Sequence, residues 1–121
     1  MVRKTEYEKI QPYTTKDGSL IRELMHPDIH GDMKQSLAEA TVPVRGMTYL
    51  HKHGKSEEIY HIVQGHGMLF LGDEQCNVTV GDTVYIPPDM PHQIKNLGDI
   101  SLKILCCSSP AYSHDDTEIL A

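Results

Sequence analysis

Several features that would assign the chain to other protein classes are absent from its 121 residues. There is no run of about 18 apolar residues, so we expect no transmembrane helix and no membrane partner. The N-terminal residues lack the apolar segment of a secretory signal, and a cytoplasmic location is therefore the expectation. Acidic residues outnumber basic ones by 17 to 11, and the formal net charge of −6 argues against nucleic acid as a partner.

Cysteine is also scarce. Cys76, Cys106 and Cys107 do not form a disulfide framework, because their number is odd and their spacing is irregular. Cys106 and Cys107 are adjacent in an apolar run, and adjacent residues on a strand point to opposite faces, so they are poor partners for each other. We interpret the cysteines as small apolar side chains rather than as redox groups.

From residue 36 onward, short apolar segments alternate with turns rich in glycine, proline and aspartate. This pattern predicts an all-β sandwich or barrel, and no segment has a clear signal for a helix of normal length. The length is typical of a single domain. We expect strands at residues 36–42, 47–53, 57–63, 68–71, 75–80, 83–86, 92–96 and 100–107.

The chain is predicted to have three parts. Residues 1–35 are interpreted as a polar arm with an edge or dimer strand, residues 36–108 as the barrel, and residues 109–121 as a C-terminal tail. The apolar run at 20–25 favours a short strand, although periodicity over so few residues does not exclude a helix. A solvated tail is favoured slightly over one whose residues 112–116 line the mouth of a cavity.

Histidine and glutamate side chains gather in three of the predicted strands. His51 and His53 are two residues apart and therefore share one strand face, while Glu58 begins the next strand and His92 follows a double-proline turn. Three neutral imidazoles and a carboxylate suit a divalent iron, manganese, zinc, nickel or copper ion. Each residue alone has an ordinary surface interpretation, so the predicted site of one metal ion depends on the combination.

Two stretches of the chain resemble a known family. Residues 46–65 closely resemble the first motif of the cupins, and residues 81–96 resemble the second. Written out, the motifs are Gly46-x4-His51-x-His53-x4-Glu58-x6-Gly65 and Gly81-x5-Pro87-x3-Pro91-His92-x3-Asn96. The first motif is one residue shorter than the usual family form, and Asp89 stands where the family usually has glycine. Neither departure affects a ligand position.

The resemblance implies a single-domain jelly-roll β-barrel with the metal bound inside it by His51, His53, Glu58 and His92. Many single-domain cupins dimerise through N-terminal strands, so the resemblance also implies a homodimer. By strand alternation, the pocket around the metal would include Met47, Tyr49, Tyr60, Ile94 and Ile104. The two tyrosines could anchor a substrate oxygen, or they could simply pack in the core.

The cupin resemblance leaves the activity open between several classes. A metal-dependent dioxygenase acting on a small organic molecule is the first expectation, with Glu58 also shuttling a proton. The alternatives are an isomerase or lyase, in which the metal polarises a carbonyl group, and a protein that binds or senses a small molecule without turnover. No arginine is expected to face inward, which weakens the case for a strongly anionic substrate such as a sugar phosphate.

Overall fold

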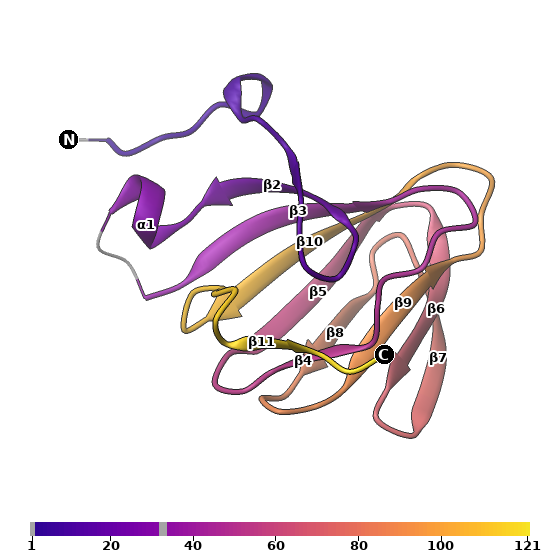
Figure 1. The fold of residues 1–121 in the computed structure, drawn as a ribbon. Coiled ribbons are helices and arrows are strands. Elements are labelled where there is room, and N and C mark those ends of the chain that lie inside the picture. The colour runs from indigo at the N-terminus through magenta and orange to yellow at the C-terminus, as the bar shows by residue number, and fades with distance from the viewer. Residues whose placement is uncertain (1, 32–33) are drawn as a thin grey trace.

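The computed structural model describes residues 2–31 and 34–121 of the chain, which form an almost entirely β structure (Figure 1). The helical segments among these residues are short: η1 (Tyr7–Lys9) and α1 (Pro27–His30). The strands are β1 (Tyr13–Thr14), β2 (Leu20–Met25), β3 (Ser36–Val42), β4 (His51–His53), β5 (Glu57–Gln64), β6 (His66–Leu71), β7 (Glu74–Thr79), β8 (Thr83–Ile86), β9 (His92–Asn96), β10 (Leu102–Ser109) and β11 (Thr117–Ile119). No helix in the described part of the chain has the length and apolar character that crossing a membrane requires.

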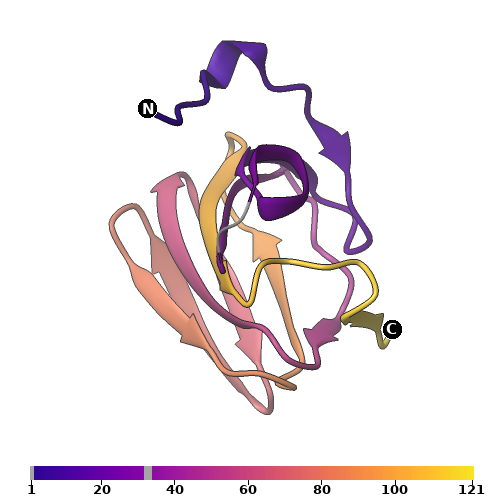
Figure 2. The same ribbon diagram turned by 90° about the vertical axis from the view of Figure 1, so that its left-hand side faces the viewer.

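Two antiparallel sheets pack against each other around a shared interior (Figure 2). One sheet has the order β1-β2-β3-β10-β5-β8, and the other has the order β11-β4-β9-β6-β7. Strands distant in the sequence are therefore neighbours, as in a jelly roll. The predicted all-β jelly-roll fold is confirmed.

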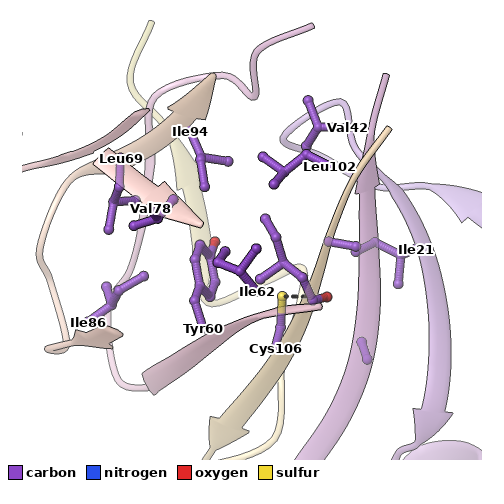
Figure 3. Close-up of a cluster of buried hydrophobic side chains, with 13 residues drawn as sticks. Ile21, Val42, Tyr60, Ile62, Leu69, Val78, Ile86, Ile94, Leu102 and Cys106 are labelled. Carbon is purple, nitrogen blue, oxygen red and sulfur yellow. Dashed lines mark hydrogen bonds between the residues drawn. The ribbon is translucent and has the colours of Figure 1, made fainter. Parts of the chain in front are cut away.

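The interior changes from apolar to polar along the paired strands β10 and β5. Buried residues alternate with more exposed ones on both strands, as the two-residue period of a strand requires. The buried positions that face each other are Ile104 with Ile62, Cys106 with Tyr60, and Ser108 with Glu58. The apolar end of this series belongs to the hydrophobic core drawn in Figure 3, where Ile62, Leu69, Ile94 and Leu102 are almost fully buried. Glu58 lies at the polar end.

The predicted strand at residues 47–53 is shorter in the structure, and its alternation was assigned incorrectly. Met47 and Tyr49 are more than half exposed, whereas Thr48 and His51 are buried. Thr48 and His51 are three residues apart, so on one regular strand they would point to opposite faces and could not both face the interior. The reason is that the Tyr49 N–H leaves the ladder and donates to the carbonyl oxygen of Asp17, so only residues 51–53 form β4.

Both ends of the chain add strands to the sheets. The segment at 20–25 is a strand, β2, which pairs with β1 and with β3 of the same chain, while residues 2–12 run outside the two sheets (Figure 2). At the other end, β11 pairs with β4, with Thr117 opposite His53 (Figure 1). The Asp116 carboxylate accepts hydrogen bonds from the N–H groups of Lys55 and Ser56. The preference for a solvated tail was therefore wrong. The homodimer stays a prediction.

Candidate metal centre

Three strands bring the four predicted ligands to one point in the interior. His51 and His53 share a face of β4, and His92 on β9 stands directly opposite His51. One ring nitrogen from each of the three histidines lies within 4.8 Å of the others. Glu58 on β5 approaches from the opposite sheet, and its Oε1 lies 2.8 Å from Nε2 of His53 and 3.4 Å from Nε2 of His92.

Backbone carbonyls fix the orientation of two of the imidazoles. Nδ1 of His51 lies 2.7 Å from the carbonyl oxygen of Tyr49, and Nδ1 of His92 lies 2.9 Å from that of Met90. A carbonyl oxygen only accepts, so each Nδ1 carries the proton and each Nε2 presents its lone pair to the centre. This arrangement is typical of metal-binding histidines.

The third imidazole is held by the C-terminal segment. Nδ1 of His53 lies 2.8 Å from Oγ1 of Thr117, and the Thr117 hydroxyl in turn donates to the carbonyl oxygen of Ser113 at 2.8 Å. The threonine oxygen is therefore the acceptor, and Nε2 of His53 is free to bind a metal. No local feature of the chain indicates the role of Thr117, because the contact joins β4 to a segment far along the chain.

Burial and charge favour the protonation states that a metal requires. Burial, and then the neighbouring His92, lower the pKa of His51 to about 4, so its imidazole is neutral near pH 7. Burial raises the pKa of Glu58, but the imidazoles of His53 and His92 beside Oε1 outweigh it and hold the pKa well below its ordinary value. The Ser108 hydroxyl also donates to Oε2 of Glu58, at 3.2 Å.

The residues fit a divalent transition metal. Oε1 of Glu58 and Nε2 of His92 are buried and have no hydrogen-bond partner among the described residues. Leaving such a group unsatisfied costs about 1–3 kcal/mol, and a cation at this point would satisfy both. Three imidazole nitrogens and one carboxylate oxygen are donors that zinc, iron, manganese, nickel and copper accept.

A second carboxylate, Asp17, also faces this centre. Asp17 lies in the turn between β1 and β2, and its Oδ2 is 3.5 Å from Nε2 of His51. Its other oxygen, Oδ1, accepts hydrogen bonds from the N–H and the hydroxyl of Ser19, which hold the side chain in place. Sequence reasoning missed the role of Asp17, because nothing local indicates that this turn lies against β4.

A cavity of about 40 Å³ opens in front of the ligands, room for roughly three water molecules. Tyr60, one of the predicted pocket residues, lines it. So do Tyr13 and Thr15, which the sequence analysis missed, and Tyr112, which belongs to the alternative that it favoured less. The other predicted pocket residues lie elsewhere: Met47 and Tyr49 are at the surface, and Ile94 and Ile104 are in the hydrophobic core. An outer pocket of about 420 Å³ adjoins the cavity and shares three of its residues, Tyr13, Glu23 and Tyr112.

Known proteins resemble the chain in sequence and in structure. An uncharacterised protein of Methanocaldococcus jannaschii is 63% identical over 117 residues, which cover 97% of this chain and 94% of that protein. The oxalate decarboxylase of Lactobacillus farciminis, solved as a formate complex, superimposes with a TM-score of 0.81 and 27% identity; the match covers 93% of this chain but only 34% of the decarboxylase.

A smaller structural relative covers nearly the whole chain. Streptomyces Pac13, described as a unique nucleoside dehydratase, has a TM-score of 0.79 over 99% of this chain and 92% of its own, and its 16% identity shows a shared fold only. The cupin domain family matches residues 38–108, which include all four predicted ligands. The chain therefore belongs to the cupin family.

Proposed function

We propose that the protein is a metal-dependent enzyme that acts on a small organic molecule inside the barrel. The observation that carries this proposal is the convergence of His51, His53, His92 and Glu58 beside a cavity, with two of their atoms buried and unpartnered. These residues would hold one divalent transition metal. When bound, such a metal supplies Lewis acidity, which polarises a carbonyl or hydroxyl oxygen of a substrate.

Asp17 is the residue best placed to move a proton at such a substrate. Its Oδ2 lies beside the ligands, while Oδ1 is fixed by Ser19 and keeps the side chain oriented. Glu58, which the sequence suggested as the proton shuttle, uses both oxygens for other contacts: Oε1 faces two imidazoles and Oε2 accepts from Ser108. A base next to a Lewis acid favours proton removal adjacent to a carbonyl, as in isomerases and lyases.

Relatives with the same fold support this choice only as an analogy. The names oxalate decarboxylase and nucleoside dehydratase both denote reactions that break a bond by elimination or loss of a group. One fold hosts many activities, so the argument for this chain depends on Asp17 and the ligand set rather than on those names.

A dioxygenase is the second candidate, and the number of ligands favours it. Four protein ligands leave two positions on a six-coordinate metal, enough for a substrate and a second small molecule. This reaction needs a redox-active metal, and it does not need the Asp17 carboxylate. The two candidates therefore predict different behaviour of an Asp17 variant.

The test combines metal analysis with proton exchange. Metal content would be measured by inductively coupled plasma mass spectrometry on untagged protein, and hydroxyacetone would be incubated with the protein in D₂O under argon and followed by ¹H NMR. We expect one metal ion per chain in the wild type and in Asp17→Asn, with deuterium exchange catalysed by the wild type alone. The isosteric asparagine keeps an oxygen for Ser19 but cannot take up a proton.

Other outcomes separate the alternatives. Oxygen uptake with turnover that survives Asp17→Asn would replace the isomerase or lyase assignment by the dioxygenase. A full metal content without turnover of any carbonyl or phenolic compound would indicate a binding protein. Absence of metal even after reconstitution would overturn the proposal.

A further inference from the structure

One buried carboxylate oxygen has no role in the metal centre. Glu23 on β2 is 8% exposed, and its Oε1 accepts a hydrogen bond from the Tyr13 hydroxyl at 2.9 Å. Its Oε2 is buried and has no hydrogen-bond partner among residues 2–31 and 34–121. Tyr13 holds the carboxylate in a fixed orientation, so the free oxygen has a defined position.

Glu23 lies between the outer pocket and the cavity in front of the predicted metal ligands. Glu23, Tyr13 and Tyr112 line both the cavity of about 40 Å³ and the outer pocket of about 420 Å³. A molecule that enters through the outer pocket must pass them. The hydroxyls of Thr15 and Tyr112 form a hydrogen bond of 3.0 Å at the same place, so the passage is narrow and polar.

The charges along this route are of one sign. The carboxylates that line the two cavities are Asp17, Glu23, Asp28, Glu58 and Asp115. No lysine or arginine occurs among the described residues that line either cavity. The two carboxylates at the centre, Asp17 and Glu58, would balance the charge of a bound divalent ion, and the charge of Glu23 would then remain available to a ligand. Such a lining attracts cations and repels anions.

We propose that Oε2 of Glu23 is an acceptor subsite for a hydroxyl or ammonium group of the substrate. The protein then takes small neutral or cationic molecules that carry a hydrogen-bond donor, and it discriminates against carboxylates and phosphates. The assignment of this ligand as a substrate rests on the proposed enzymatic function, whereas the binding of a donor group at Glu23 does not.

The chain supplies a matched control for Glu23. Glu39 on β3 is 9% exposed and also accepts a hydrogen bond from a tyrosine of the N-terminal segment, Tyr7. It lines neither cavity. Glu23→Gln and Glu39→Gln therefore make the same chemical change in similar surroundings, and only the first changes a carboxylate that lines the cavities.

The experiment uses zinc-loaded, ¹⁵N-labelled protein titrated with ethylene glycol, ethanolamine and acetate, which have equal numbers of non-hydrogen atoms. Shifts of the amide signals of residues 13, 23 and 112 give the affinities, and zinc content verifies that the centre is intact. We expect Glu23→Gln to weaken binding of the glycol or the amine by about tenfold or more, as loss of a hydrogen bond to a charged acceptor requires. Acetate should bind no more weakly to this variant than to the wild type, and Glu39→Gln should behave as the wild type.

The two donor probes identify the group that the subsite recognises. An effect on ethanolamine alone assigns it to ammonium groups, and an effect on both probes assigns it to donors in general. Equal affinities in the wild type and Glu23→Gln, a preference for acetate, or no binding of either donor probe would overturn the proposal. The same titrations on metal-free protein distinguish failure of the proposed metal site from failure of the proposed Glu23 subsite. A protein that does not bind zinc would contradict the metal site, but binding of the probes at Glu23 could still be measured.

Discussion

The hydrogen bond between His53 and Thr117 makes the C-terminal segment part of the candidate metal centre, and Thr117→Val tests this. The substitution keeps the shape of the side chain and removes only the hydroxyl. That hydroxyl accepts from Nδ1 of His53 at 2.8 Å and donates to the carbonyl oxygen of Ser113 at 2.8 Å, and Thr117 is 4% exposed. The valine variant therefore leaves a buried imidazole N–H and a carbonyl without these partners.

The size of the effect follows from these contacts. Removing the group that orients a metal-binding imidazole typically weakens metal affinity by about 10- to 100-fold. Leaving buried polar groups unpaired should lower the free energy of unfolding by about 1–3 kcal/mol. For a domain of this length, the melting temperature should then fall by roughly 5 °C or more.

Metal affinity would be measured by competition with a chromophoric zinc chelator, and stability by thermal unfolding of the metal-free protein. Thr117→Ser is the control, because it keeps the hydroxyl and removes only a methyl group, and its zinc affinity should stay near that of the wild type. A valine variant with wild-type zinc affinity would refute the reasoning. So would a serine variant that loses as much zinc affinity as the valine variant.

Three further outcomes are expected. His51→Ala combined with His53→Ala should abolish metal binding measured by mass spectrometry while lowering the melting temperature only modestly; full metal content would disprove the ligand assignment. Leu102→Ala should lower the free energy of unfolding in urea by about 2–5 kcal/mol, because Leu102 is fully buried, whereas Ile100→Ala, half exposed, should change it by less than about 0.5 kcal/mol. Burial raises the pKa of Asp116, but the N–H groups of Lys55 and Ser56 outweigh it and lower the pKa below its ordinary 3.8. The stability that the carboxylate adds is therefore complete above pH 3.8 and is lost below it. The urea midpoints of the wild type and Asp116→Asn should differ at neutral pH and converge in acid.

The local pattern of the sequence determined the fold class and the positions of the four predicted ligands. Turn residues between short apolar segments indicated the strands, because the two-residue period and the turn chemistry are local properties. The same period placed His51 and His53 on one face, and the motif spacing placed Glu58 and His92 near the starts of two further strands, β5 and β9. These features need no knowledge of distant contacts.

Only the tertiary structure decided what surrounds the ligands. Asp17, Glu23 and Thr117 reach the centre or its cavity from segments far away in the sequence, and contacts between such segments leave no periodic signal. The hydrogen bond from the Tyr49 N–H to the Asp17 carbonyl oxygen also interrupts the regular strand alternation, so Met47 and Tyr49 lie at the surface. The sequence by itself therefore determined the donors that would bind a metal, because their arrangement follows local strand geometry. The carboxylates and hydroxyls that would meet a substrate were decided by the packing of both chain ends against the barrel.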